Sequence, residues 1–560
     1  MKKIKNIIRW GLCCMTALAA TSCDDYFEPD NATVLDGDNY IKEQSELYSG
    51  YLGVINKLQD VGDKAIYLTD TRAELLEPTG NNDELVDIYN YEPDLSGNSY
   101  ADPAKYYDLV IACNDYLAKV KSYKDAHAEA IDMDHYEGLV SCIVRLKAWT
   151  YFTIAKIYGQ AAWFDTPMLT LVDIASLETL DLDETLDRCS LLLEEGFDGV
   201  DGKHTMDWAE WILSVNADDA TAGDYYYWNK MVPDYFVLAA DIALWRGEYQ
   251  KVIDLILPAM NEVLITTDLR SGQATWLCAG SYGNSYSRIF DALTPSSLAA
   301  VDVITYDYAN GQRNYLIQHF YNDYMLRPSV VGVNRYLDFE FNPRAEDKVD
   351  RRYSNFIGER DGELYFHKYR RLSGSSRSNS LQDDVHIYIY RNIDLYFMLA
   401  EAYNQLLRSD VTESLINDGV NKKFLDEGLL YHPLFNEWTK STFRGTRVYC
   451  DGGVRGNTGL LGRDIHIFDS LKVYTEQEVE TITRHNDSLI VCERILEQPG
   501  EGKTYESMLR VARRYGDYSI IANFVCPKYP LHQQEVIRQR IVAEGGYFVP
   551  WDLKKKSSVH

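Results

Sequence analysis

Apolar residues recur along much of the chain at the spacing of one face of an α-helix. In the segment YYDLVIACNDYLAKV, the apolar positions are separated by three residues or one, and they are Tyr106, Leu109, Val110, Cys113, Tyr116, Leu117 and Val120. Because an α-helix has 3.6 residues per turn, such positions share one stripe on its surface. The pattern predicts a helix here. The same pattern from Leu139 to Ile157 predicts a second helix, which Gly159 ends.

Two further segments predict pairs of helices joined by short turns. In the segment from Pro233 to Leu264, Pro233 suits a first helical turn and the turn RGEY separates two apolar stripes. The segment from Arg391 to Leu407 repeats the scheme, with residues 412–424 as its partner helix. Paired helices with small alanines at the crossing resemble tetratricopeptide units, although a generic helical bundle has the same periodicity.

Irregular segments rich in Gly, Asn, Asp, Ser and Tyr separate the helical blocks. They span residues 77–102, 271–295, 374–380 and 435–462, and alternation over residues 301–308 predicts a short strand. Loops on a rigid helical frame are common sites of binding. The fold class predicted is therefore mainly α, a tetratricopeptide-like helical-repeat scaffold with long irregular loops and a few short strands.

The first 22 residues have the layout of a secretory signal. Four bases precede an apolar core of about ten residues, which is too short to span a bilayer, where ~20 are needed. The core runs into Ala20-Thr21-Ser22-Cys23, which resembles a bacterial lipobox. The resemblance implies that Cys23 becomes the acylated N-terminus of the mature protein. A plain signal peptide with a cysteine at this position by chance is the alternative.

The residues after Cys23 predict an extended tether. Six acids and no base lie between Cys23 and Asp38, so this segment repels itself and does not fold alone. Asp24-Asp25 followed by Tyr26, Phe27 and Glu28 resembles the acidic export tag of Bacteroidota surface lipoproteins. Lipid chains would hold the protein to a membrane at ~0.8 kcal/mol per buried methylene.

Net charge and cysteine usage narrow the function classes. The 560 residues carry a formal charge of −29, and the signal removes four bases and no acid. Such a body repels nucleic acid and anionic lipid. The cysteines left after Cys23 are odd in number and widely spaced, which does not fit a disulfide framework. Cys113 and Cys142 lie on apolar helical stripes, and we expect both to be buried.

Catalytic and metal-binding motifs are weak or missing. GEGKT at residues 500–504 suggests a phosphate loop, but the required first glycine is replaced by Glu497, whose charge repels phosphate. The chain lacks HExxH and GxSxG, and no acid pair stands out for glycoside hydrolysis. A surface cation at Asp383, Asp384 and His386 is conceivable, although solvated loop acids explain these residues more simply. We expect no enzyme activity, no cofactor and no metal.

Three segments carry a resemblance to the SusD/RagB family of Bacteroidota. The stretch EGLVSCIVRLKAWTYFTIAKIYGQAAWFDTP, residues 137–167, is similar to a family helix followed by a Tyr-Gly pair, a loop and a proline, with Lys147 as a departure. RNIDLYFMLAEAYN, residues 391–404, is similar to a second family helix, with Asp394 in place of the usual Glu. Asp350-Arg351-Arg352 resembles an Asp-x-Arg motif of the family.

The family's C-terminal motif matches less well. Glu493, Arg494 and Glu497 fit it, but Thr504 and Tyr505 lie near the position of the expected Arg and Ser507 lies near that of the expected Asp, with Arg510 as a candidate substitute for the Arg. The resemblance implies no catalytic role for Glu401, which we expect to make a buried or capping hydrogen bond between helical repeats.

The resemblance implies a surface lipoprotein that binds a nutrient oligomer and delivers it to a SusC-type TonB-dependent outer-membrane transporter. It places the protein at the cell-surface face of the outer membrane, anchored at Cys23. The regions implied are a signal peptide at 1–22, a tether at 23–40, an N-terminal helical-repeat region at 41–345 and a C-terminal region at 346–560.

The ligand class implied first is a glycan, and the 43 tyrosines favour it because a tyrosine ring stacks on sugar rings. A peptide ligand, as in RagB-like members, is the alternative within the family. A helical-repeat adaptor for protein partners is the alternative from another class.

The family places its ligand face on the loop before the first long helix and on the middle insertions. By region, this implicates aromatic residues with polar partners, and for any single tyrosine packing on a helix is the simpler role. The predicted site residues are Tyr89, Tyr91, Tyr100, Trp276, Tyr282, Tyr286, Tyr315, Tyr321 and Tyr324, with Asp70, Arg72 and Arg327 as hydrogen-bonding partners.

Overall fold

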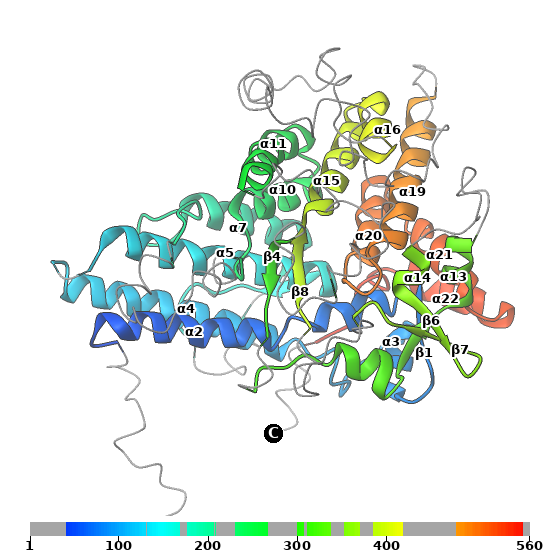
Figure 1. Cartoon of the computed structure of the whole chain (residues 1–560), viewed down its shortest axis with the longest axis horizontal. Coiled ribbons are helices and arrows are strands. Elements are labelled where there is room, and N and C mark those ends of the chain that lie inside the picture. The colour runs from blue at the N-terminus through cyan, green and yellow to red at the C-terminus, as the bar shows by residue number, and fades with distance from the viewer. Residues whose placement is uncertain are drawn as a thin grey trace, which may run out of the picture.

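The described part of the chain is mostly helical, as its hydrophobic pattern predicts (Figure 1). The computed structural model describes residues 41–129, 131–168, 176–177, 179–206, 208, 230–266, 290, 300–306, 311–337, 352–369, 385–417 and 478–552. Within these ranges, no helix has the length and hydropathy needed to cross a membrane. The predicted signal and tether lie outside them.

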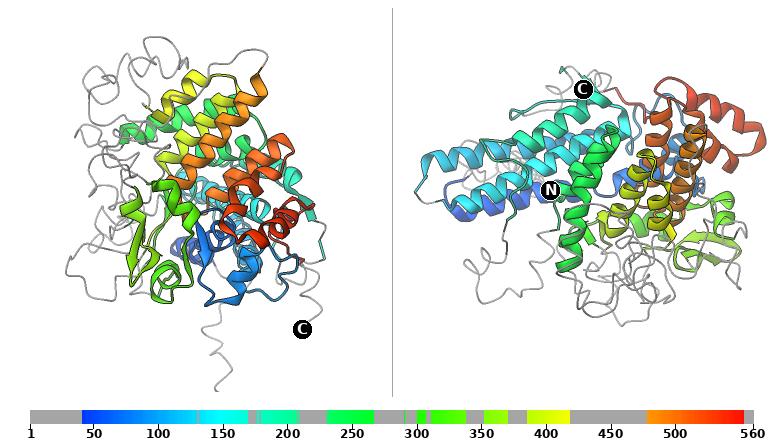
Figure 2. Two further views of the ribbon diagram at one scale, coloured as in Figure 1. Left: turned by 90° about the vertical axis from the view of Figure 1, so that its right-hand side faces the viewer. Right: turned by 90° about the horizontal axis from the view of Figure 1, so that it is seen from above.

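The helices form a succession of packed neighbours, in which α15 packs against both α16 and α19, and this succession confirms the tetratricopeptide-like scaffold. The first group comprises α2 (Gln44–Gln59), α4 (Ala104–Ala126), α5 (Met133–Tyr158), α7 (Leu182–Glu195), α10 (Tyr235–Trp245) and α11 (Tyr249–Thr266). The second group comprises α15 (Asn392–Gln405), α16 (Ser409–Asn417), α19 (Val479–Glu497), α20 (Thr504–Tyr515), α21 (Ser519–Val525) and α22 (Leu531–Val542). Contacts between α11 and α15 join the groups, and Figures 1 and 2 show α2 and α22 at opposite ends of the molecule.

Local sequence signals set the ends of these helices. Gly159 ends α5 with a φ of +73°, a conformation that glycine adopts without strain. Asp234 caps α10 by accepting hydrogen bonds from two amides of its first turn. Pro233 therefore precedes the cap instead of lying in the first turn, which corrects the sequence prediction. The partner helix α16 begins at Ser409, three residues before the predicted start.

The strands form four two-stranded antiparallel ribbons that join distant parts of the chain. The pairs are β1 (Leu76–Pro78) with β5 (Leu326–Pro328), β2 (Gln160–Ala162) with β3 (Thr179–Asp181), β4 (Ala300–Ile304) with β8 (Ile387–Arg391), and β6 (Ile357–Arg360) with β7 (Glu363–Phe366). The predicted strand at 301–308 is confirmed as β4, and it is buried on both faces. Short helices α13 (Val330–Leu337) and α14 (Arg352–Phe356) lie near these ribbons (Figure 1).

The segment 77–102 is not wholly irregular, which is a second correction. Residues Asp83–Tyr89 form helix α3, because the Asn82 side chain accepts a hydrogen bond from the Leu85 amide at 2.9 Å and so caps its start. The many Asn, Asp and Gly residues of this segment predicted a loop, so the capping role of Asn82 was not predicted. The other predicted loops lie outside the described residues, apart from residue 290.

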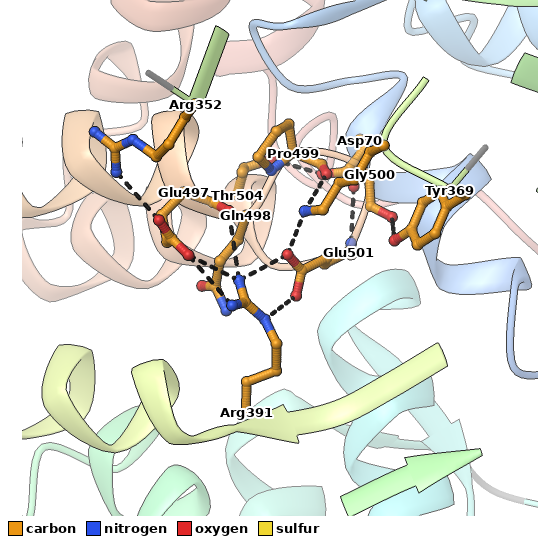
Figure 3. A network of polar contacts seen from close by, with 12 residues as sticks. Asp70, Arg352, Tyr369, Arg391, Glu497, Gln498, Pro499, Gly500, Glu501 and Thr504 are labelled. Atoms are coloured by element: carbon orange, nitrogen blue, oxygen red, sulfur yellow. Dashed lines mark hydrogen bonds and ion pairs between the residues drawn. The ribbon is translucent and has the colours of Figure 1, made fainter. Parts of the chain in front are cut away.

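A buried ionic network holds the C-terminal region together. The guanidinium of Arg391, at the end of β8, lies between Glu497 at 3.2 Å and Glu501 at 2.8 Å (Figure 3). Arg352 contacts the other oxygen of Glu497 at 3.2 Å, and Lys368 pairs with Glu501. Burial lowers the pKa of Lys368 to about 8. Every charge in this group has an opposite partner, which buried ions require.

The segment GEGKT belongs to this network and is not a phosphate loop. It follows helix α19, so the strand that a phosphate loop needs is missing. The Asp70 carboxylate accepts hydrogen bonds from the Gly502 amide at 2.8 Å and the Thr504 hydroxyl at 2.6 Å. A carboxylate therefore occupies the position that an anion would need.

Two smaller predictions are confirmed. Glu401 is buried on α15 and accepts hydrogen bonds from Arg510 at 2.7 and 2.8 Å, with Arg514 on its other side. It thus links α15 to α20 as a structural ion pair. Cys113 and Cys142 are both buried and unbridged.

Candidate functional site

Aromatic side chains gather where two π-helical turns and two β-ribbons meet. The turns are η1 (Ile66–Asp70) and η4 (Gln318–Asn322), and η4 packs against β5 and β7. Figure 1 places β1, β6 and β7 together at this corner of the molecule. π-Helical turns are rare and often lie at functional sites. We call the surface here the aromatic face, comprising Tyr67, Tyr100, Tyr315, His319, Tyr321, Tyr324, Arg360 and Tyr365.

His319 organises one half of the aromatic face. Its ring stacks on Tyr67 with centroids 4.5 Å apart, and its Nε2 atom lies 2.7 Å from the hydroxyl of Tyr100. Its Nδ1 atom lies 2.8 Å from the backbone oxygen of Tyr315. Burial lowers the pKa of His319, so the ring is neutral at pH 7. The contacts assign the proton to Nδ1, which donates to the carbonyl, while Nε2 accepts from Tyr100.

Tyr315 is the most exposed ring of the face. Its side chain is 55% exposed. Its backbone amide donates to the buried carboxylate of Asp63 at 2.9 Å, and its carbonyl accepts from His319. The Tyr315 ring faces solvent, while hydrogen bonds to Asp63 and His319 fix its backbone. Binding a ligand on this ring therefore costs little conformational entropy of the main chain.

Tyr321 and Tyr365 form the second half of the face. Their rings lie edge to face with centroids 5.4 Å apart, and the guanidinium of Arg360 lies 4.8 Å from the Tyr321 centroid. Both rings are half-buried, and Arg360 is exposed. Aromatic surface beside a solvent-exposed cation is suited to a ring-shaped ligand with hydroxyl or acidic groups.

Tyr324 is held in a left-handed backbone conformation with a φ of +50°. Its hydroxyl donates to the Leu364 carbonyl at 2.6 Å, and its own carbonyl accepts from the Asn81 amide group at 3.2 Å. Such a conformation is uncommon for a bulky residue and costs of order 1 kcal/mol or more. Arg327, the middle residue of β5, pairs with Glu77 at 2.8 Å and with Glu363 at 3.1 Å.

Three predicted site residues have their polar groups engaged inside the protein. Asp70, Arg72 and Tyr91 are only 1%, 2% and 4% exposed. Asp70 binds the 502–504 turn as described. The guanidinium of Arg72 lies 4.1 Å from the Tyr91 ring and donates to backbone carbonyls of the C-terminal segment, among them Gly546 at 2.6 Å. Arg72 and Tyr91 also line a cavity of about 530 Å³ beside the C-terminal segment. The part of these three residues in ligand binding stays a prediction.

The remaining predicted residues are placed as follows. Tyr89 is half-buried and packs on Tyr529 at 4.4 Å, with the Lys528 ammonium 4.4 Å from its ring. Trp276, Tyr282 and Tyr286 lie outside the described residues, and their part in binding stays a prediction.

Four members of the aromatic face were not predicted: Tyr67, His319, Arg360 and Tyr365. Arg360 lies on β6 and Tyr365 on β7, the two strands that an Asp-Gly turn joins. In this turn Asp361 and Gly362 have φ of +55° and +84°. Asp-Gly between two short strands is a strong hairpin signal, and it could have placed both residues. His319 and Tyr67 carry no such local signal, since their roles depend on contacts across the fold.

The side chains of the aromatic face are suited to binding a ligand. The described residues hold no group of three or more His, Cys, Asp or Glu side chains placed to bind a metal ion. Exposed rings can stack on a ligand, while hydroxyl, guanidinium and carboxylate groups at the rim can fix its orientation. Most of the predicted cation cluster lies outside the described residues, and His386 is buried.

Comparison with known proteins gives similarity in structure alone. No family model and no curated protein matches the sequence. A SusD superfamily protein from Bacteroides vulgatus ATCC 8482 superposes with a TM-score of 0.58 and 12% identity, over 92% of this chain and 97% of that chain. A laminarin binding SusD-like protein gives 0.55 and 13%, over 92% and 98%. Surface glycan-binding protein A from Bacteroides thetaiotaomicron, in complex with laminarihexaose, gives 0.51 and 14%, over 92% and 97%. The chain therefore has the SusD-like fold over nearly its whole length.

Proposed function

We propose that the protein is a SusD-family surface lipoprotein that binds an oligosaccharide on its aromatic face. In this proposal it hands the ligand to a TonB-dependent outer-membrane transporter and does not cleave it. The observation that carries the proposal is the exposed Tyr315 ring, held beside Tyr100 and His319 on a SusD-like fold. Two proteins of this fold are described as laminarin-binding and as bound to laminarihexaose.

The geometry of the aromatic face supports a sugar ligand. Sugar rings present C–H groups on one face and hydroxyls at their edges, so they combine stacking on a tyrosine with hydrogen bonds at the rim. Arg360 and Arg327 lie beside the rings and can donate to hydroxyl or carboxylate oxygens.

The N-terminal sequence supports a surface location. Acylation at Cys23 would leave residues 24–40 as a charged tether before α2, which begins at Gln44. An extended chain spans at most ~3.3–3.6 Å per residue, so this tether gives the folded body a reach of roughly 55 Å from the membrane. That reach would allow a lipid-anchored body to move against a membrane-embedded partner.

Calorimetry on residues 24–560 tests the proposal directly. We would titrate β-glucan, α-glucan and host-type glycan oligomers, and a peptide digest, into the wild type and into a Tyr315→Ala/Tyr321→Ala variant. The proposal expects saturable heat with at least one glycan, and loss of that heat in the variant. Leu531→Ala is the matched control, since this residue is 87% exposed on α22 and is not a member of the aromatic face. Binding of peptides alone, or glycan binding that the double variant leaves unchanged, would contradict the proposal.

A further inference from the structure

A large cavity lies beside the C-terminal segment, separate from the aromatic face. It has a volume of about 920 Å³ and is bounded by residues 93–102, the ends of β2 and β3, and residues 545–552. No member of the aromatic face lines it. Ser99 lines the cavity, whereas the hydroxyl of the next residue, Tyr100, is bonded to His319. Its volume is at the upper end of those found for small-molecule sites.

The cavity wall is acidic. Asp94, Asp102, Asp181 and Asp552 line it, and among the described residues of the lining there is no Lys, Arg or His. Three of these carboxylates are oriented by backbone amides that donate to them at 2.9–3.0 Å. A concave wall of one charge sign concentrates the opposite charge, and here the whole chain carries −29. The wall therefore favours a cationic group.

The cavity floor is aromatic. Phe548 and Trp551 line it together with Tyr158, which is only 6% exposed. The Tyr158 hydroxyl is buried without a hydrogen-bond partner among the described residues, although such groups are nearly always satisfied. Burial, then Tyr106, then Asp102 raise the pKa of Tyr158. The influence of Asp102 shows that the Tyr158 hydroxyl lies near the acidic wall. The floor thus combines a stacking surface with an unused donor.

Hydrogen bonds hold the two sides of the cavity in place. The Val549 amide donates to the Ile157 carbonyl at 2.8 Å, and the Gln160 side chain donates to the Trp551 carbonyl at 3.3 Å. A Cβ on Gly159 would lie 2.4 Å from the Phe548 ring, so the C-terminal segment fits closely over the end of α5. The cavity is therefore preformed, and a ligand need not order the chain to enter it.

We propose that this cavity is a second binding site, which takes an amino sugar: a saccharide ring that carries a free ammonium group. The ring lies on Trp551 and Phe548, and the ammonium lies against Asp94 and Asp552. Ammonium–carboxylate hydrogen bonds are about twice as strong as neutral ones, and an ammonium is also attracted to an indole face. Ser96, Ser99 and Thr179 line the cavity. The Ser96 and Ser99 hydroxyls donate to the carboxylates of Asp94 and Glu84, so their oxygens face the sugar as acceptors for its hydroxyl groups.

The proposal rests on the proposed saccharide-binding function for its ligand class. The rim of short polar side chains favours a saccharide over a lysine-rich peptide, because aliphatic side chains offer no hydroxyl donors to the acceptor oxygens of the rim. The site differs from the aromatic face in location and in charge, so each can fail without the other.

Two oligomers with the same backbone test the proposal. We would titrate glucosamine hexamer and its N-acetylated counterpart, which lacks the positive charges, into residues 24–560 at low and moderate salt. The wild type is expected to bind the amine form at least ten times more tightly, with a preference that weakens as salt rises. Asp94→Asn/Asp552→Asn is expected to remove the preference. The matched control, Glu195→Gln/Asp254→Asn, removes two exposed acids elsewhere and is expected to keep it.

Further arms separate the possible failures. A chain ending at Asp552 lacks Lys554, Lys555 and Lys556, which follow the cavity in sequence and could compete for it; the preference should survive this truncation. The Tyr315→Ala/Tyr321→Ala variant should also keep the preference, whether or not it loses neutral glycans. Equal binding of both hexamers, tighter binding of hexalysine than of the amine hexamer, or a preference that the Asp94/Asp552 variant retains would each overturn the proposal.

Discussion

The ring of Tyr67, in one π-helical turn, stacks on the ring of His319, in another, with centroids 4.5 Å apart and planes 28° apart. The two residues are far apart in sequence, and their contact brings the N-terminal helical region against the insertion that carries Tyr315. The aromatic face is therefore a product of tertiary packing. The buried side chains of Asp63 and His319 hold the backbone of the exposed Tyr315 in place. Their effect on stability can be measured separately from ligand binding.

Replacing Tyr315 by Ala should weaken glycan binding without affecting the fold. The side chain is more than half exposed, while the hydrogen bonds at this position are made by its backbone. We expect a loss of about tenfold in affinity, equivalent to ~1.4 kcal/mol, and a melting temperature within ~1 °C of the wild type. Calorimetry and thermal denaturation measure the two quantities. A large drop in melting temperature would show that the ring is structural.

Protonation of His319 should destabilise the protein. Burial lowers its pKa below the ordinary 6.5, so the folded state binds the proton less tightly than the unfolded state does. The stability linked to this group is present above pH 6.5 and is lost as pH falls from there toward the lowered pKa. His319→Gln should flatten the melting temperature between about pH 5 and pH 7. An unchanged slope in denaturation at several pH values would argue against a neutral His319.

Asp70→Asn should leave ligand binding intact and change the pH dependence of stability. Burial raises the pKa of Asp70 to about 6, so ionising it costs stability as pH rises from about 4 to 6. The shift corresponds to a cost of up to ~3 kcal/mol in that window, which the neutral amide should remove. Urea denaturation at pH 4, 5, 6 and 7 measures it. Thr69→Ser, a neighbour whose hydroxyl bonds its own turn, is the control.

A change in glycan affinity for Asp70→Asn would return this residue to the binding site. An unchanged affinity would support its assignment to the 502–504 turn.

Glu401→Gln should be strongly destabilising. Burial alone would raise the pKa of this carboxyl. The charges of Arg510 and Arg514 outweigh that effect and hold the pKa well below its ordinary value. The neutral amide leaves two buried guanidinium groups with less compensating charge, at a cost of ~3–5 kcal/mol. Chemical denaturation measures this cost. For the wild type, the contribution is present above the ordinary pKa of Glu and is lost as pH falls below about 4.5 toward the depressed value.

Helical periodicity alone predicted the scaffold. The stripe around Leu109 and the glycine at 159 located α4 and α5 because burial of one helix face repeats every turn. The same reasoning missed α3, since its seven residues are too few to show a stripe and only the Asn82 cap marks it.

The aromatic face was predictable only in part. Tyr100, Tyr315, Tyr321 and Tyr324 were implicated by the regions that form the ligand face in the resembled family, but a region cannot separate a buried tyrosine from an exposed one. Tyr91 and Tyr315 look alike in sequence, and only the fold shows that one is 4% and the other 55% exposed. The sequence did not predict His319, because its role depends on contacts with Tyr67 and Tyr100 that are distant in sequence and leave no local pattern.

The most direct test of the account is a crystal structure of residues 24–560 with the glycan that calorimetry identifies. The account predicts a sugar ring stacked on Tyr315 or Tyr321 at van der Waals distance, with hydroxyls within hydrogen-bond reach of the Arg360 or Arg327 side chains. A neutral glycan seated elsewhere, with Tyr315 and Tyr321 left solvent-exposed, would contradict the assignment of the aromatic face as the binding site.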